Sequence, residues 1–418
     1  MGGWTLVALV FLGYALLARR LDRWSITAPI VMVLAGALLG AGYLDVLPVV
    51  PDTEPIKLVT ELTLALILFA DASTVPLRQA RADAGFPGRL LGIGLPLTIG
   101  LGTVAARLVF PSVSWAEAAL ISAILAPTDA ALGITVVTNP AVPARVRRVL
   151  NIESGLNDGI ATPFVTVLLA VVVAGAADDG WVGDSFFDLA RGVLIGIAIG
   201  LAGGWAVRRA ESRDWTTPLS DELMVLSLAL LSYGAAVTNS GNGFVAAFVA
   251  GLVFGAASRG QMARATEFTD TVGLFSSFLV WIIFGAAFVG PVIDAGVHLR
   301  PIVYAVLSLT VVRMVAVVVS LTGDHLRRDT VGFIGWFGPR GLASVVFTLI
   351  AFDALAGSAE ARSLVEVTTW TILLSVLAHG ISSGPLAAWY GRRLEGAPED
   401  TPELGIVAPP RLRRRSLA

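Results

Sequence analysis

The stretch Asn151-Ile-Glu-Ser-Gly-Leu-Asn-Asp-Gly159 decides how this chain is read, because it places polar side chains at the start of a long apolar run. If the stretch is helical, Ser154, Asn157 and Asp158 lie at positions i, i+3 and i+4 and share one face. A charge at the centre of a bilayer costs roughly 2.5–3.5 kcal/mol, so acids placed there are by default ion, proton or substrate sites. The alternative is that Asn-Asp-Gly forms a turn, that 139–160 is a loop, and that the span begins only at Ile160.

The composition indicates a membrane protein with many spans. Hydrophobic residues make up 56% and charged residues 14% of 418 residues, and the mean hydropathy is +0.80, which excludes an ordinary soluble globule. The net charge of −2 gives no indication of a nucleic acid partner. Cysteine is absent, which excludes disulfides, thiolate metal sites and a cysteine nucleophile. No catalytic triad or phosphate-binding loop is evident, so we expect neither an enzyme nor a cofactor.

Apolar runs of about 20 residues predict thirteen membrane helices. They lie near 4–18, 26–45, 57–74, 90–110, 115–138, 149–176, 185–207, 221–238, 243–258, 268–290, 299–322, 330–352 and 364–389. The first run is not read as a signal peptide, because no positive segment precedes it and three arginines follow it.

Basic residues indicate the orientation, because loops that stay in the cytoplasm keep their arginines. Alternate connections are rich in arginine, with Arg19, Arg20, Arg23, Arg78, Arg81, Arg89, Arg145, Arg147, Arg148, Arg208, Arg209, Arg213, Arg259, Arg264, Arg327 and Arg328. The loops between them carry almost no positive charge, apart from Arg300 and Arg362. We therefore expect the N-terminus outside, the C-terminus in the cytoplasm, and a multi-pass protein of the cell (inner) membrane. Residues 395–418 read as a short cytoplasmic tail, disordered near anionic lipid.

Thirteen helices divide as six, one and six, and an odd linker helix turns the second six over, as in inverted-repeat transporters. The fifth helix of each half is interrupted, by Ala126-Pro127-Thr128-Asp129 in the first and by Phe337-Gly338-Pro339-Arg340-Gly341 in the second. Pro127 removes an amide donor and frees the carbonyl of Ala123. Non-helical backbone at bilayer depth needs protein or a cavity around it, so we expect the two discontinuous helices to cross and form a site.

Six ionisable residues fall well inside the predicted spans: Asp71, Asp129, Glu153, Asp158, Arg313 and Arg340. Asp158 has Asn157 and Ser154 nearby, and Asp129 has Thr128 and the freed carbonyls, which are oxygen ligands suited to a hard cation such as Na⁺. An unpaired arginine at that depth is too costly, so Arg313 is predicted to pair with Glu153.

The remaining polar groups inside the spans are ambiguous. Arg340 either neutralises the carbonyl ends of half-helices or binds an anionic substrate. Asp71 is either an accessory ligand or an interfacial cap. Glu61 and His379 are read as polar contacts between helices.

These motifs resemble those of the cation/proton antiporters of the NhaP and NHE type, and the resemblance covers essentially all thirteen helices. The elements that carry it are Pro127-Thr128-Asp129, Glu153-Ser154-Gly155-Leu156-Asn157-Asp158-Gly159 and Gly338-Pro339-Arg340-Gly341. It implies a homodimer with a transmembrane domain of residues 1–394, in which the spans between 90 and 176 and between 299 and 389 form a mobile core. The spans between 4 and 74 and between 185 and 290 form the interface.

The resemblance also implies residue roles. Asp158, Asp129, Ser154 and the Thr128 carbonyl coordinate the transported ion, Glu153 pairs with Arg313, and an acid such as Asp71 reaches the ion through water. The chain departs from some relatives at Pro339, where these have a different apolar residue.

The sequence thus predicts an antiporter that exchanges Na⁺ or Li⁺ for H⁺, one for one, by alternating access. Asp158 binds either the cation or a proton. Two alternatives stay open: a K⁺/H⁺ antiporter on the same fold, and a sodium-coupled symporter of an organic anion in which Arg340 binds the substrate carboxylate.

Overall fold

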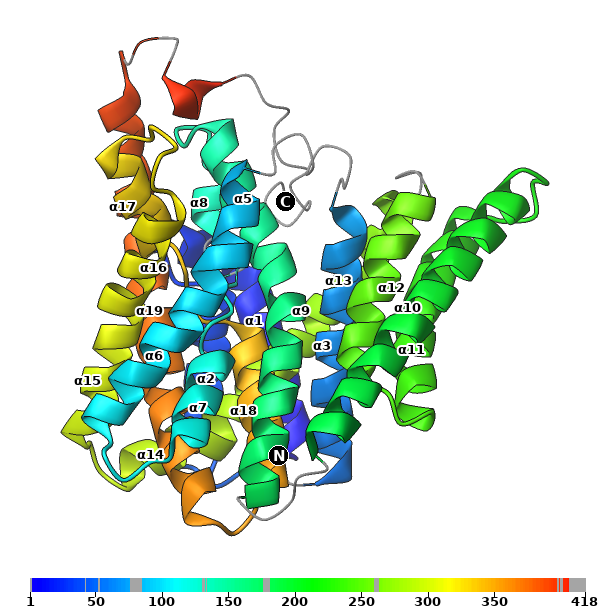
Figure 1. Ribbon diagram of the computed structural model, residues 1–418. Helices are drawn as coiled ribbons and strands as arrows, with labels where there is room; N and C mark the ends of the chain where they lie inside the picture. The colour runs from blue at the N-terminus through cyan, green and yellow to red at the C-terminus, as the bar shows by residue number, and fades with distance from the viewer. Residues whose placement is uncertain are drawn as a thin grey trace. The chain divides into compact units, whose positions relative to one another are not determined.

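The computed structural model describes residues 2–41, 43–51, 53–75, 85–129, 132, 134–175, 181–258, 263–396, 398 and 401–405. Within these residues every regular element is helical (Figure 1). Eight helices are long and apolar enough to cross a membrane, and four further apolar helices in the described part of the chain are shorter. The prediction of an all-helical membrane protein is therefore confirmed.

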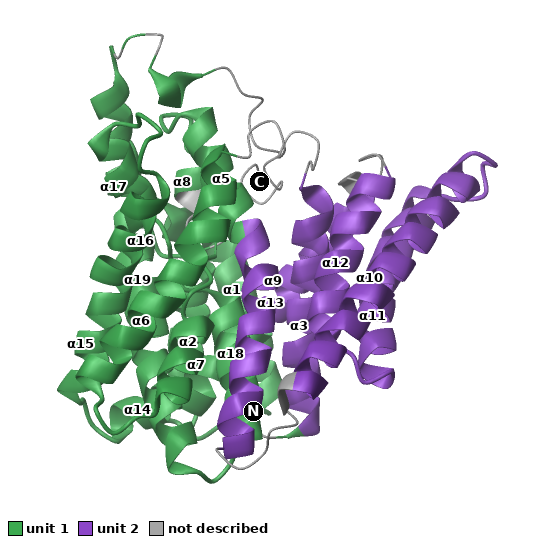
Figure 2. Cartoon of the chain, in the orientation of Figure 1, with its two compact units in different colours: residues 1–53, 85–154, 278–418 green, residues 54–84, 155–277 purple. Residues whose placement is uncertain are grey.

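The chain divides into two compact units, which are described separately (Figure 2). Unit 1 comprises residues 1–53, 85–154 and 278–418, and unit 2 comprises residues 54–84 and 155–277. Unit 1 contains α1 (Gly3–Arg23), α2 (Ala28–Leu39), α5 (Gly85–Arg89), η1 (Leu90–Gly94), α6 (Leu95–Val109), α7 (Trp115–Ile124), α8 (Ile134–Thr138), η3 (Gly285–Val289), α14 (Gly290–Asp294), α15 (Leu299–Leu307), η4 (Ser308–Val312), α16 (Arg313–Ser320), α17 (Arg328–Trp336), α18 (Leu342–Ala354), α19 (Ala359–Leu394) and η5 (Pro402–Leu404). Unit 2 contains α3 (Glu54–Thr74), α10 (Trp181–Glu211), α11 (Pro218–Thr238) and α12 (Gly243–Ala257), and the helices α9 (Ala144–Ala174) and α13 (Ala263–Phe284) belong partly to each unit.

In unit 2, α12 packs between α10 and α3, and glycines make both contacts close (Figure 1). A Cβ on Gly200 of α10 would stand 2.8 Å from the carbonyl oxygen of Ala250, and a Cβ on Gly251 of α12 would stand 3.0 Å from the Cβ of Ala72 on α3. Small residues let helix backbones approach closely in a membrane, where van der Waals packing drives helix association. The glycines therefore set the spacing of these three helices.

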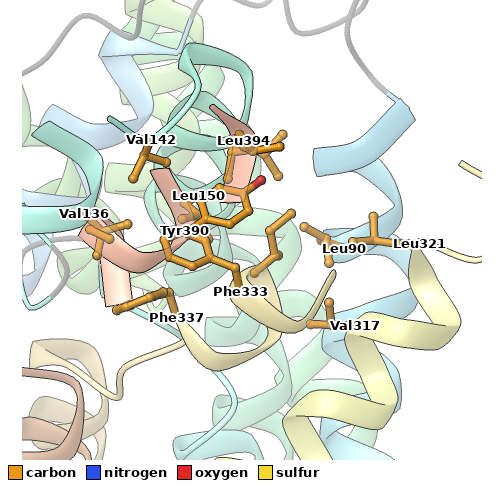
Figure 3. Close-up of a cluster of buried hydrophobic side chains, with 14 residues drawn as sticks. Leu90, Val136, Val142, Leu150, Val317, Leu321, Phe333, Phe337, Tyr390 and Leu394 are labelled. Atoms are coloured by element: carbon orange, nitrogen blue, oxygen red, sulfur yellow. The ribbon is translucent and has the colours of Figure 1, made fainter. Parts of the chain in front are cut away.

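A cluster of buried apolar side chains forms part of the core of unit 1 (Figure 3). The ring of Phe333 on α17 stacks on Tyr390 of α19, with centroids 4.2 Å apart and planes 18° apart. Val149 and Leu150 of α9 and Leu90 of η1 belong to the same cluster. This core fixes the second half of α17 against α9 and α19.

The expected disorder of the tail is wrong for residues 401–405. Glu403 is 1% exposed, and the Arg145 guanidinium donates a hydrogen bond to the carbonyl of Pro402 at 2.6 Å. The segment is ordered because its carboxylate and carbonyl find donors on α17 and α9. Residues 406–418, including the tail arginines from Arg411 onward, lie outside the described residues.

The stretch 151–159 is helical, because α9 runs without interruption from Ala144 to Ala174. The turn and loop alternative for 139–160 is therefore wrong. In the predicted span 115–138, α7 ends at Ile124 and α8 begins at Ile134, and in 330–352, α17 ends at Trp336 and α18 begins at Leu342.

Candidate ion site

Asp129 and the segment between α17 and α18 are joined by two hydrogen bonds within unit 1. The N–H of Asp129 donates to the carbonyl of Pro339 at 2.8 Å, and the N–H of Leu342 donates to Oδ2 of Asp129 at 3.3 Å. A side chain at Gly341 would overlap the Asp129 carboxylate, so the close approach requires glycine there. Asp129 thus lies at the N-terminus of α18, where the helix dipole favours a negative charge.

The carbonyl end of α7 receives one donor from the same segment and one from α18. Nη1 of Arg340, which is fully buried, donates to the carbonyl of Ala126 at 2.9 Å, and the Ser344 hydroxyl donates to the carbonyl of Ile124 at 2.7 Å. The expected free carbonyl at Ala123 is a wrong detail, because it accepts from the N–H of Ala126 at 3.4 Å. The helix tightens at its last turn, and the carbonyls that accept from other parts of the chain are those of Ile124 and Ala126.

Thr128 and Ser154 lie side by side in unit 1, as expected for two residues predicted to coordinate one ion. Their hydroxyl oxygens lie 3.3 Å apart, and the residues are 1% and 8% exposed. Ser154 lies on α9 in the turn before Asp158, whereas Thr128 directly precedes Asp129 in the segment after α7. Two hydroxyls in this position supply oxygen atoms without adding charge.

Glu153 and Arg313 form the buried ion pair that the sequence predicts. Nη1 and Nη2 of Arg313 donate to the two carboxylate oxygens of Glu153 at 2.6 and 3.0 Å, and both side chains are about 5% exposed or less. Arg313 begins α16 directly after the π-helical turn η4. Both charges are therefore compensated by a two-point contact.

Asp71, Asn157 and Asp158 belong to unit 2. Asn157 is 2% exposed, and Asp158 is half-buried on α9. A Cβ on Gly155 would stand 3.9 Å from the Cβ of Asp71, so α3 places Asp71 against the turn of α9 that leads to Asp158. Asp71 therefore lies near the stretch 151–159, although it is 87 positions earlier in the chain than Asp158 (158 − 71).

The two predicted interhelical contacts are confirmed. The Tyr233 hydroxyl of α11 donates to Glu61 of α3 at 2.5 Å, and Nε2 of His379 on α19 lies 2.9 Å from the carbonyl of Trp336 at the end of α17.

Residues 7–389 match the family model described as sodium/hydrogen exchanger, transmembrane. This chain belongs to that family. It is therefore a multi-pass membrane protein of a transporter family.

Curated relatives and a solved structure agree with the family. The chain is 26% identical over 360 residues to the K⁺/H⁺ antiporter NhaP of Alkalimonas amylolytica, which covers 84% of this chain and 61% of the relative. It is 26% identical over 316 residues to the Na⁺/H⁺ antiporter of Schizosaccharomyces pombe, covering 67% and 66%. The chain thus spans less than two thirds of the length of these relatives.

The sodium proton antiporter MjNhaP1 of Methanocaldococcus jannaschii shares the fold, with a TM-score of 0.74. It is 20% identical, and the match covers 92% of this chain and 97% of the other.

Two residues around the site were missed from the sequence. Ser344 contacts the end of α7 and Ser375 contacts the segment between α17 and α18, and each sits in an otherwise apolar run where it looks ordinary. The one available signal was that Ser375 precedes His379 by four residues, which is one helical turn.

Proposed function

We propose that this protein exchanges Na⁺ or Li⁺ for H⁺ across the membrane, one for one, by alternating access. The observation that carries the proposal is on α9, where Asp158 follows Ser154 by one turn and the Ser154 hydroxyl meets the Thr128 hydroxyl. The printed activities of the relatives, K⁺/H⁺ and Na⁺/H⁺ exchange, support a monovalent cation and a proton as the transported ions.

In this mechanism Asp158 binds either the cation or a proton, never both. Asp129, Ser154, the Thr128 carbonyl and Asn157 supply further oxygen atoms to the cation, and Asp71 reaches it through water. Oδ2 of Asp129 accepts from the N–H of Leu342, which places this carboxylate at the N-terminus of α18. Only a loaded site crosses the membrane, so competition for one carboxylate couples the two ions.

The coupling has a simple energetic form. At one-for-one exchange, a difference of one pH unit balances a tenfold cation gradient, because each is worth about 1.4 kcal/mol. No resident cofactor takes part in this cycle.

A K⁺/H⁺ antiporter is the second candidate, because several relatives carry that name. The oxygen ligand types do not separate Na⁺ from K⁺. The third candidate, a symporter of an organic anion, has less support, because Arg340 is fully buried and its Nη1 is bonded to the carbonyl of Ala126.

We also propose the membrane arrangement. The eight long apolar helices, the shorter ones and α3 account for thirteen spans in two inverted repeats, with α7–α8 and α17–α18 as crossed discontinuous helices. The alternation of arginine-rich loops supports an outside N-terminus and a cytoplasmic C-terminus in the cell membrane. The protein works as a homodimer, with the spans between 90 and 176 and between 299 and 389 moving as the core.

Everted membrane vesicles test the proposal. They are energised to an acid interior, Na⁺, Li⁺ and K⁺ are added in turn, and proton efflux is recorded. Efflux with Na⁺ and Li⁺ is expected, efflux with K⁺ alone supports the second candidate, and no efflux with any cation refutes cation/proton exchange.

A further inference from the structure

The chain between α17 and α18 is not helical, so its backbone N–H and C=O groups lack the partners that a continuous helix would provide. Trp336 ends α17, and Arg340 stands two residues before the first residue of α18. A buried carbonyl or amide without a partner is costly, and inside a membrane it must be satisfied by protein. The partners of the Trp336 carbonyl and the Arg340 amide therefore hold the two ends of this segment.

The Trp336 carbonyl accepts a hydrogen bond from the nearby N–H of Gly338 at 2.8 Å. Its second contact and the partner of the Arg340 amide both come from a single turn of α19. Nε2 of His379 lies 2.9 Å from the carbonyl of Trp336, and the N–H of Arg340 donates to the Ser375 hydroxyl at 2.7 Å. The Ser375 hydroxyl and Nδ1 of His379 lie 3.1 Å apart. One chain of hydrogen bonds thus runs from the end of α17, through His379 and Ser375, to the amide just before α18.

The chemistry of the chain decides where its protons lie. A carbonyl only accepts, so Nε2 of His379 carries a hydrogen. The Ser375 oxygen accepts from Arg340, and its own hydrogen is free to bond to Nδ1. Nδ1 also lies 2.8 Å from the Ser375 carbonyl, which would require a second ring proton. That imidazolium would be 1% exposed, and burying a charge is costly. A neutral ring donates from one nitrogen only, so it can donate to the Trp336 carbonyl or to the Ser375 carbonyl but not to both. We assign the hydrogen to Nε2, because Nδ1 can then accept from the Ser375 hydroxyl.

We propose that His379 and Ser375 are positioning residues for ion exchange. They clamp both ends of the segment between α17 and α18, and this segment holds Asp129 through the bond from the Asp129 N–H to the Pro339 carbonyl. The inference rests on the proposed role of Asp129 as an ion ligand. Neither residue touches the ion. They fix the backbone positions of Pro339 and Arg340. These in turn fix the positions of the Asp129 carboxylate and the Arg340 guanidinium.

The first test is transport by Ser375→Ala and Ser375→Thr in proteoliposomes. Ser375→Ala removes the hydroxyl and is expected to raise the apparent KM for Na⁺ about twofold to tenfold, the range that one hydrogen bond supports, with a smaller change in the maximal rate. Ser375→Thr keeps the hydroxyl and is expected to restore the KM.

Ser383→Ala is the matched control. Ser383 lies on the same helix, is equally buried, and donates to the carbonyl of Gly380 within α19. If Ser375→Ala and Ser383→Ala change the KM equally, or if threonine does not rescue, the clamp is refuted.

The second test is the protonation state of His379. The chain has three histidines, so ¹⁵N-histidine labelling gives few signals, and His379→Gln identifies the one from residue 379. We expect a neutral ring with hydrogen on Nε2 at about neutral pH, shifted by Ser375→Ala and unchanged by Ser383→Ala. A neutral ring with hydrogen on Nδ1, or an imidazolium, would overturn the assignment.

The two tests separate the inference from the function. If no variant or wild-type protein exchanges ions, the proposed function fails while the histidine signal still tests the clamp. If exchange is normal and the KM does not respond to Ser375→Ala, the proposed function stands and the positioning role fails.

Discussion

The carboxylate of Glu403 accepts a hydrogen bond from the backbone N–H of Arg327, 2.8 Å away, at the N-terminus of α17. The Thr330 hydroxyl donates to the same oxygen at 2.6 Å. A residue 76 positions further along the chain, counted from Arg327 (403 − 327), therefore caps this helix. The cap ties the tail to α17, whose other end leads into the segment that holds Asp129.

Glu403→Ala is expected to lower the free energy of unfolding by about 1–2 kcal/mol, the cost of losing a helix cap. The change is measured as a shift of the melting temperature in detergent. Glu395→Ala is the control, because Glu395 is exposed on the same tail. Equal shifts for the two variants would show that the cap contributes nothing.

Asp158→Asn is expected to leave a folded protein without exchange of any cation, because the single titrating ligand is lost while the volume is kept. Proton efflux from vesicles checks this for Na⁺, Li⁺ and K⁺. The control is Asp184→Asn, which removes an exposed carboxylate at the start of α10. Proton efflux at the wild-type rate in Asp158→Asn would refute the proposed mechanism.

The capping of α18 by Asp129 and its proposed binding of the ion are expected to separate by substitution. Asp129→Asn keeps an oxygen that accepts from the N–H of Leu342, so it retains the melting temperature but loses cation affinity in calorimetry. Asp129→Ala loses both and is destabilised by about 1 kcal/mol. Unchanged cation affinity in Asp129→Asn would leave Asp129 with the capping role alone.

Glu153 and Arg313 are expected to stabilise the fold together. Removing one partner of a buried pair leaves an uncompensated charge and costs roughly 3–5 kcal/mol. Glu153→Gln or Arg313→Ala therefore lowers the melting temperature, and the double variant loses less than the sum of the two. Strict additivity would contradict the contact.

Exchange is expected to be electroneutral, because Asn157 stands where a second carboxylate would be, and an amide does not take up a proton near neutral pH. The exchange rate in proteoliposomes should stay constant when valinomycin and K⁺ impose a membrane potential of either sign. A rate that changes steadily with voltage would show net charge transfer, with Asp129 as the second proton carrier.

Charged residues inside apolar runs allowed part of the site to be predicted from the sequence. Glu153 and Arg313 are each too costly to bury alone, so their pairing followed from their depth in the predicted spans. The helix interruptions at Pro127 and Gly338-Pro339 could also be predicted from the sequence, because proline and glycine disturb a helix regardless of its neighbours. The resemblance then added the roles of Asp158 and Asp129.

Other features had little or no local signal. Ser344 and Ser375 are ordinary residues of apolar helices, and Glu403 lies in a charged, proline-containing tail that reads as disordered. Their roles depend on which carbonyl or amide another helix leaves without a partner.

The sequence by itself determined the helical membrane class, the family and the residues that carry charge into the bilayer, because periodicity, hydropathy and the cost of buried charge act along the chain. Only the tertiary structure decided which backbone groups those side chains satisfy. Ser375 meets Arg340, and Glu403 meets Arg327, because helix packing brings together residues that are distant in sequence.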